Sequence, residues 1–406
     1  AAAALRLRRS EDWGLCPRRA SPEGIWEPEK IMRPDTEAGL AEIIAAAKGP
    51  FHIRGGGTRS VGKPVAGEVL ETGGLSGITL YEPGALTVVA QAGTPLAEIE
   101  TALEAEGQRL AFEPMDHRGL LGTGGEPTIG GVVAANVSGP RRVQAGACRD
   151  FMLGVRCVDG TGQVVKNGGR VMKNVTGYDL VKLMTGSWGT LGVLTEVSLK
   201  VLPKPESAAC ILIDGLSDAD AVAAMATALG SPFEITGAAH LPLGPDGAPV
   251  TMLRIEGFAQ SVDYRAGALQ RLFGDHPVRV ERDPDAVARQ WRQVRDVGAM
   301  QDQAGDVWRV SCKPSESPAL AARLEADQLL YDWGGGLIWA RLPEGTDARA
   351  RLGDFAGHAT LLRGSEASRA ALPVFQPEPA ALAALSDGIR AKFDPRGLLN
   401  PGLMAS

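Results

Sequence analysis

The sequence contains few cysteines and histidines, and neither type is grouped. Its five cysteines include no C-x-x-C pair, and its five histidines form no H-x-H or H-E-x-x-H pattern. A disulfide framework, a structural zinc site and an iron–sulfur cluster all require ligand spacings that this sequence lacks. We therefore expect reduced cysteines, no metal site and, because no secretory signal is recognisable, a cytoplasmic location.

Long apolar runs and an excess of positive charge are also missing. No stretch approaches the roughly 18 consecutive apolar residues of a membrane span. Lys and Arg number 42 against 48 Asp and Glu, a net charge of −6, which argues against a protein that coats nucleic acid or an anionic membrane. With 44% hydrophobic and 22% charged residues over 406 positions, the composition predicts a globular protein of two or three domains.

Glycine is the residue in excess, and its distribution divides the chain. There are 52 glycines, about twice the usual share of roughly 7%, and they cluster in loops without a period. Residues 1–31 are rich in alanine and arginine, and we interpret them as an extension that is loosely ordered or lies upstream of the native start. Residues 32–205 hold the glycine clusters, residues 206–391 alternate strand and helix patterns, and residues 392–406 form a tail.

Hydrophobic periodicity predicts the main elements of the two large parts. Thr94 is the expected cap of the second helix, with Pro95 as its first residue. The alternation in the second part predicts an α+β domain, an antiparallel sheet covered by helices. Helices are expected at residues 35–47, 95–106, 174–184, 219–229, 262–273 and 379–393, and strands at residues 51–54, 86–92, 153–158, 162–165, 193–201, 208–213, 250–258, 308–312, 337–342 and 359–363.

The first glycine loop, residues 55–58, directly follows a predicted strand. Consecutive backbone N–H groups without side chains bind anions, most simply a phosphate, although a tight turn is the alternative. The spacing from Gly57 to Gly62 and Lys63 is that of a P-loop, but Pro64 stands where the Mg²⁺-binding Ser or Thr is needed. No G-x-G-x-x-G opens a helix after an early strand, so a Rossmann NAD site is not supported either.

Two further loops, residues 128–139 and 186–192, place small residues where a flat ring or a pyrophosphate can lie against the backbone. Three glycine loops in one domain exceed what turns alone require. Their sequences resemble flavoproteins of the vanillyl-alcohol oxidase type, which share an FAD-binding domain with p-cresol methylhydroxylase (PCMH). The resemblance rests on RGGGT at 54–58, TIGGVVAANVSGPRR at 128–142, KNVTGYDLVKLMTGSWGTLGVLTEVSLKVLP at 173–203 and FDPRGLLNPG at 393–402.

The resemblance covers roughly residues 32–203 and the tail. It implies an α+β fold in which a two-subdomain PCMH-type FAD-binding domain, residues 32–205, carries an α+β cap domain, residues 206–391. The tail, residues 392–406, is implied to return to the flavin. Because no His follows the loop at 54–58, and covalent relatives use a His or Cys at defined places, the implied FAD is non-covalent.

Within this family the chain resembles the smaller FAD-binding subunits of bacterial glycolate oxidases. Such subunits work with a larger FAD-linked subunit and an iron–sulfur subunit, and electrons from glycolate reach a quinone-type acceptor. The resemblance therefore implies these partners, and any attachment to the inner membrane face is made through them. It rests on residues 32–43, 139–142, 237–242, 358–363 and 373–377.

The resemblance also assigns individual residues to FAD. The first loop should hold the pyrophosphate, through Arg54, Gly55, Gly56, Gly57 and Thr58. The isoalloxazine and ribityl portion should be lined by Pro114, Thr123, Thr128, Ile129, Gly130, Gly131, Asn136 and Gly139. Gly189 and Val193 should contact FAD through the backbone, and Asn400 should reach the flavin from the tail. Structural roles are implied for Lys173, Asn174, Tyr178 and Asp179.

The catalytic residues stay unassigned. Larger relatives carry a histidine cluster in the cap that binds a metal and the α-hydroxy acid, whereas His240, His276 and His358 are isolated here. Oxidation of such an acid needs a base for the hydroxyl proton and a cation for the carboxylate. Arg341, Arg363 and His358, near predicted strand ends of the cap, are candidates, although each is equally readable as a surface charge or an interface ion pair.

Three functions are compatible with these observations. The first is an FAD subunit of a glycolate oxidase complex that transfers electrons and takes part in substrate oxidation. The second is a self-contained FAD-dependent 2-hydroxy-acid dehydrogenase, which the missing metal cluster disfavours. The third is a non-catalytic structural subunit, which the intact loop glycines disfavour.

Overall fold

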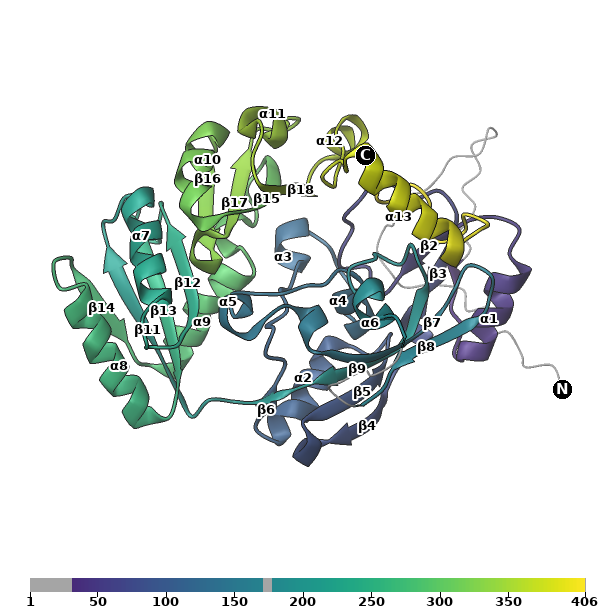
Figure 1. Cartoon of the computed structure of the whole chain (residues 1–406), viewed down its shortest axis with the longest axis horizontal. Helices are drawn as coiled ribbons and strands as arrows, with labels where there is room; N and C mark the ends of the chain where they lie inside the picture. Colours follow the sequence, from purple (N-terminus) through teal and green to yellow (C-terminus); the bar gives the residue numbers. More distant parts are fainter. Residues whose placement is uncertain (1–30, 171–176, 406) are drawn as a thin grey trace.

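The computed structural model describes residues 31–170 and 177–405 (Figure 1). Nearly all of the expected extension therefore lies outside the described residues, as do Lys173 and Asn174. Ile31, the last residue of that extension, is the first residue of strand β1 (Ile31–Met32). Among the described residues, no helix has both the length and the apolar character needed to span a membrane.

The chain begins with a small parallel sheet in the order β1-β3-β2, where β3 is Glu68–Glu71 and β2 is Phe51–Arg54. Helix α1 (Glu37–Ala46) starts where Thr36 accepts a hydrogen bond from the backbone of Gly39. Its buried Leu40 and Ile44 pack in one cluster with strand residues and with Leu398 and Leu399 of the tail. The C-terminal residues are therefore part of the N-terminal core.

A five-stranded antiparallel sheet forms the centre of the first half, in the order β4-β5-β9-β7-β8. Six of the eight residues of strand β9 are buried, because α4 packs on it as well as its neighbouring strands. The strands are β4 (Ile78–Glu82), β5 (Thr87–Gln91), β7 (Met152–Val158), β8 (Val164–Gly168) and β9 (Val193–Lys200), and the helices of this half are α2 (Leu96–Ala105), α3 (Arg118–Leu121), α4 (Ile129–Ala134), α5 (Arg142–Ala145) and α6 (Leu180–Met184).

Two helix starts differ from the sequence-based expectation. Helix α2 begins at Leu96 after Pro95, and the Thr94 hydroxyl donates to the carbonyl of Gln91 at 2.7 Å instead of capping the helix. Helix α6 begins at Leu180, where the Asp179 side chain accepts from the backbone N–H of Lys182. The carboxylate cap fixes this start, while residues 174–176 of the expected helix lie outside the described residues.

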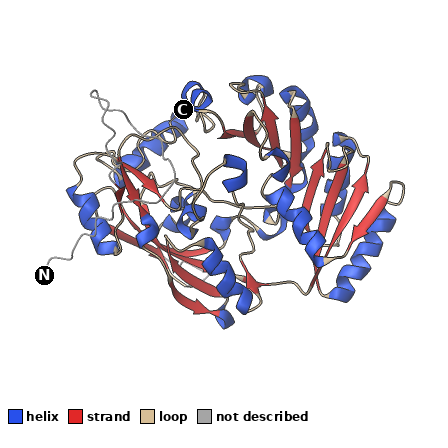
Figure 2. Cartoon of the chain, turned by 180° about the vertical axis from the view of Figure 1, so that it is seen from behind, coloured by secondary structure: helices blue, strands red, loops and turns tan. Residues whose placement is uncertain are grey.

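The second half is an eight-stranded antiparallel sheet in the order β14-β11-β13-β12-β16-β17-β15-β18, flanked by helices (Figure 2). The short strands β6 (Gln108–Arg109) and β10 (Leu202–Pro203) pair just before the chain enters it. Its strands are β11 (Ser207–Asp214), β12 (Ile235–Leu241), β13 (Val250–Gly257), β14 (Val278–Glu281), β15 (Asp306–Cys312), β16 (Gln328–Asp332), β17 (Leu337–Leu342) and β18 (Gly357–Arg363), and its helices are α7 (Asp218–Leu229), α8 (Ala259–Leu272), α9 (Pro284–Arg295), α10 (Ser317–Leu324) and α11 (Ala348–Leu352); α12 (Glu366–Ala371) and α13 (Ala380–Phe393) follow.

Strand β12 was not expected from the sequence, and its packing explains why. The middle of the strand carries the small residues Gly237, Ala238 and Ala239 in place of large β-branched ones, and Gly237 lies under the ring of Trp291 from α9. A Cβ at Gly237 would stand 2.7 Å from two carbons of that ring. The large side chain at this point of the core is Trp291 of the helix and not a residue of the strand. The sequence of the strand therefore lacks the apolar pattern that would have identified it.

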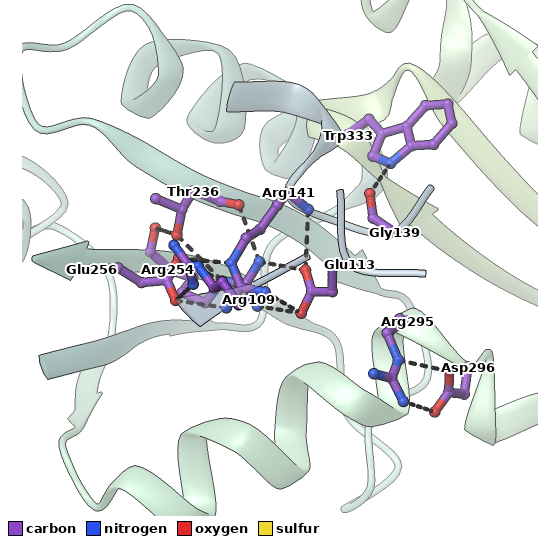
Figure 3. A network of polar contacts seen from close by, with 10 residues as sticks. All are labelled: Arg109, Glu113, Gly139, Arg141, Thr236, Arg254, Glu256, Arg295, Asp296 and Trp333. Carbon is purple, nitrogen blue, oxygen red and sulfur yellow. Dashed lines mark hydrogen bonds and ion pairs between the residues drawn. The ribbon is translucent and has the colours of Figure 1, made fainter. Parts of the chain in front are cut away.

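A network of buried ion pairs joins the two halves (Figure 3). Glu113, in the loop after β6, accepts two hydrogen bonds from Arg254 of β13, at 3.0 and 2.9 Å. Glu256 of β13 in turn accepts two from Arg141, at 2.9 and 2.6 Å, and one from Arg109 at 3.0 Å. Each half thus contributes both a carboxylate and a guanidinium group to the network.

Burial raises the pKa of Glu113 and Glu256, but Arg254 and Arg141 outweigh it and hold both pKa values below the usual range. The stabilisation is therefore complete above the unfolded Glu pKa of roughly 4.3 and is lost as the pH falls through the lower folded values. Arg254 is 2% exposed, so its removal leaves Glu113 buried without the two hydrogen bonds that Arg254 donates to it.

We predict that Arg254→Met lowers the free energy of unfolding by about 3–5 kcal/mol at pH 7, measured by urea titration. The control is Arg279→Met, which removes an exposed pair with Asp214 and should cost less than about 1 kcal/mol. The difference between wild type and Arg254→Met should shrink below about pH 4. Equal losses in the two variants at pH 7 would contradict this assignment.

Candidate functional site

The first two glycine loops touch through their backbones. A Cβ at Gly56 would lie 1.6 Å from the carbonyl oxygen of Glu126, and one at Gly125 would lie 2.1 Å from that of Gly56. At Gly55 a Cβ would stand 2.6 Å from the Thr128 hydroxyl oxygen. Only glycine permits this approach, so the close contact of the two loops explains glycine at these positions.

The two loops differ in whether their backbone N–H groups already have protein acceptors. At the start of α4, the N–H groups of Ile129, Gly130 and Gly131 bond the carbonyl oxygens of Thr94 and Ala92 and the hydroxyl of Thr128, at 3.0, 2.8 and 3.3 Å. Within residues 31–170 and 177–405, the N–H groups of Gly56 and Gly57 donate to no protein acceptor. Free donors for an anion therefore lie in the first loop, while the second offers a close-packed surface.

Arg59 lies beside these free donors, and the motif comparison did not single it out. Its Nε donates to Nδ1 of His117 at 3.2 Å, and its Nη1 is 3.1 Å from where a Cβ of Gly131 would stand. Its Nη2 is buried and has no partner among the described residues. Its place directly after the glycine loop was the signal that could have identified it.

The charges around Arg59 favour an additional anion. Burial lowers the pKa of Arg59 to about 10, partly offset by Asp116. Burial and the neighbouring Arg59 lower the pKa of His117 to about 3, so the imidazole is neutral near pH 7 and its Nδ1 can accept the hydrogen bond from Arg59 Nε. A buried guanidinium with one unpartnered nitrogen is stabilised by an oxygen anion that reaches it.

The third loop is attached to the second. The N–H groups of Gly186 and Trp188 donate to the carbonyls of Val133 and Ala134 at the end of α4, at 3.1 and 2.9 Å. Gly189 has φ +72°, a conformation suited to glycine. Val193 follows it at the start of β9 and is fully buried. All three glycine loops therefore converge in one region.

Asn400 joins the tail to this region. Its Oδ1 accepts from the N–H of Ile53 at 2.8 Å, and its Nδ2 donates to the carbonyl of Trp188 at 2.9 Å. It is 3% exposed and has φ 47°. The amide thus connects β2, which leads into the first loop, with the third loop. Any effect of Asn400 on a ligand runs through these two segments.

The remaining expected site residues bond to other segments of the chain. The Thr123 hydroxyl donates to the carbonyl of Thr58 at 3.0 Å, and Arg54 pairs with Glu71. Asn136, with φ 48°, accepts from the N–H of Arg149 through its side chain. Pro114 is buried next to Glu113 of the ionic network, and Gly139 accepts from the Trp333 indole at 3.1 Å.

The two cap arginines considered from the sequence have structural partners. Arg363 donates to the carbonyls of Leu120, Met300, Gln303 and Gly305. Arg341 donates to the carbonyl of Ala304 and pairs with Asp327. Both guanidinium groups hold chain segments together, and Nε of Arg341 is buried without a hydrogen-bond partner among the described residues. Among the described residues no group of three His, Cys, Asp or Glu side chains is arranged to hold a metal.

Comparison with known proteins identifies the region. Residues 28–168 match the family model described as FAD binding domain. The chain is 36% identical over 360 residues to glycolate oxidase subunit GlcE of Escherichia coli (strain K12), covering 88% of this chain and 93% of that protein. It is also 31% identical to glycolate oxidase subunit GlcD of Bacillus subtilis (strain 168), over 48% of this chain and 41% of that protein.

A D-lactate dehydrogenase of Anaerostipes hadrus is 36% identical over 47% of this chain and 40% of that protein. Among solved structures, alkyldihydroxyacetonephosphate synthase has a TM-score of 0.68 at 17% identity, over 91% of this chain and 75% of that one, a likeness of fold. The comparisons confirm the expected α+β fold with a PCMH-type FAD-binding domain, and FAD as its cofactor.

We predict that Gly56→Ala abolishes FAD retention, because its Cβ cannot coexist with the Glu126 carbonyl and the two loops must separate. The measurement is the flavin absorbance per protein after purification, and after incubation with added FAD. Gly49→Ala is the control, since a Cβ there meets nothing within 4 Å. Wild-type flavin content in Gly56→Ala would show that the loop contact is dispensable.

Proposed function

Because the chain belongs to the family of FAD-linked oxidoreductase subunits that includes GlcE of glycolate oxidase, we propose that it is the FAD-binding subunit of a complex that oxidises glycolate to glyoxylate. In this proposal a larger FAD-linked subunit and an iron–sulfur subunit are its partners, and the electrons pass to a quinone-type acceptor. Residues 32–205 form the FAD-binding domain, residues 206–391 the cap domain and residues 392–406 the tail that locks the flavin loops.

The observation that carries the proposal is the convergence of unused donors in the first loop. The free N–H groups of Gly56 and Gly57 and the unpartnered Nη2 of Arg59 suit the two phosphates of FAD. When bound, FAD would supply the electron acceptor for the oxidation of a 2-hydroxy acid. The chain's own residues hold the cofactor and keep its loops together.

The residues present fit a dissociable cofactor. Neither His nor Cys occurs in residues 55–62, so the first loop has no side chain of the kind used for covalent attachment. His117, next to Arg59, has its Nδ1 occupied by the Arg59 Nε–H. We therefore propose that FAD is bound non-covalently and that Arg59, with His117 positioning it, provides the charge that retains the phosphates.

We predict that Arg59→Met raises the dissociation constant of FAD by about 10- to 100-fold, since a hydrogen bond to a charged group contributes roughly 1.5–3 kcal/mol. Arg59→Lys should recover part of this loss. The measurement is quenching of flavin fluorescence on titration of the flavin-free protein. Arg282→Met, which removes an exposed arginine paired with Asp263, is the control. An unchanged dissociation constant in Arg59→Met would remove Arg59 from the site.

The function itself is tested by the visible spectrum of the purified chain. We expect flavin absorption bands that dithionite bleaches under anaerobic conditions. Bleaching by glycolate as well would mean that the chain has its own oxidation site. If glycolate does not bleach the flavin bands, the chain has no oxidation site of its own and serves only in electron transfer with its larger partner. Colourless protein that takes up no added FAD would contradict the proposed function.

A further inference from the structure

One face of the cap sheet carries a positive charge, that of Arg309, which has no role in the proposed function. Arg309 of β15 lies opposite Trp339 of β17 and Thr360 of β18 in the antiparallel register. Directly paired residues of neighbouring strands point to the same face, so Arg309 shares its face with these two. The next residue along β15, Val310, is fully buried and points to the other face.

A second arginine approaches from the FAD-binding half. Arg142 is the first residue of α5 and directly follows Arg141 of the ionic network. The Cζ atoms of Arg142 and Arg309 lie 4.4 and 5.0 Å from the centre of the same ring, that of Trp333. The Trp333 indole is itself fixed, because its N–H donates to the carbonyl of Gly139 at 3.1 Å and its backbone N–H donates to Asp332 at 2.7 Å.

Neither guanidinium has a protein acceptor. Among the described residues, Arg142 and Arg309 donate no side-chain hydrogen bond and form no ion pair, and their contacts are cation–π contacts with tryptophan. Arg141, one residue away, is by contrast paired with two carboxylates. Two cations that contact the same tryptophan ring and have unused donors are arranged to receive an anion.

The surrounding charges do not neutralise the pair. Burial lowers the pKa of Arg309 to about 10, Arg142 lowers it further and Asp332 opposes this. Burial also raises the pKa of Asp332 to about 7, so near neutral pH that carboxyl is only partly charged. Burial lowers the pKa of Arg142, with Arg149 acting in the same direction and Asp150 against it. Burial and both arginines lower the pKa of His358.

We propose that Arg142 and Arg309 together bind the carboxylate of a short 2-hydroxy acid, one arginine from each half of the molecule. The proposal rests on the proposed function, which supplies this substrate class. The phosphates of FAD have donors of their own at Gly56, Gly57 and Arg59, so the carboxylate is the remaining anion of the reaction. A guanidinium fork matches the two oxygens of a carboxylate, and the Trp333 ring holds both forks in place.

The experiment titrates the FAD-loaded chain with glycolate, with acetate, which keeps the carboxylate alone, and with glycolamide, which replaces the carboxylate by an uncharged amide. Binding is followed anaerobically by tryptophan fluorescence and by perturbation of the flavin spectrum. We expect saturable binding of glycolate and acetate but not of glycolamide. The fluorescence change should be absent in Trp333→Phe.

Arg309→Met and Arg142→Met should each weaken acetate binding by at least about tenfold, the scale of losing one charged hydrogen-bonded partner. Arg279→Met is the matched control, because it removes an exposed cap arginine that is paired with Asp214, and it should leave acetate binding unchanged. Arg309→Lys should retain part of the affinity. FAD content and the urea midpoint establish that each variant is folded.

The outcomes separate the two proposals. A chain that binds no FAD contradicts the proposed function, whatever its affinity for acetate. A flavin-loaded chain that binds neither glycolate nor acetate, or whose arginine variants bind them like wild type, overturns the carboxylate site alone. If Arg309→Met and Arg142→Met lose FAD affinity while acetate has no effect on wild type, the pair belongs to the cofactor and the carboxylate site is likewise overturned.

Discussion

The buried ion pairs of Glu113 and Glu256 with three arginines are the interaction on which the rest of the structure depends. Glu113 immediately precedes Pro114, and Arg141 lies between Gly139 and Arg142, so the network is attached to the loops of the proposed site. Arg254 and Glu256 belong to the same cap strand. A carboxylate that loses its partner inside a protein is strongly destabilising, so the network fixes the cap sheet against the flavin-binding loops.

Much of the fold was predictable because its determinants are local. The strand at residues 51–54 and the strand at 337–342 follow from their apolar pattern, and the structure has them with the same bounds. Strand β12 escaped because its identity depends on Trp291, a residue more than 50 positions away. A sequence pattern records the side chains of one element and not those that a neighbouring element contributes.

The site was predictable to the extent that backbone geometry demands glycine. A Cβ at Gly55 or Gly56 would collide with Thr128 or Glu126, and a Cβ at Gly130 would collide with Ala92. The charged residues were harder, because a free arginine and a paired one look alike in sequence. Arg341 and Arg363 proved to be held by carbonyls and a carboxylate, whereas Arg142 and Arg309 meet only through tertiary packing around Trp333.

The tail also sets the order in which the molecule can be completed. Phe51 of β2 exchanges backbone hydrogen bonds with Leu398 and Asn400, and the side chain of Asn400 reaches Ile53 across 347 positions of sequence. Contacts between residues so far apart in sequence form late in folding, because the entropy cost of closing a long loop comes before any contact stabilises it. The strand that leads into the first glycine loop therefore cannot pair with the tail until the whole cap has been synthesised, and a chain that ends before residue 398 lacks this pairing.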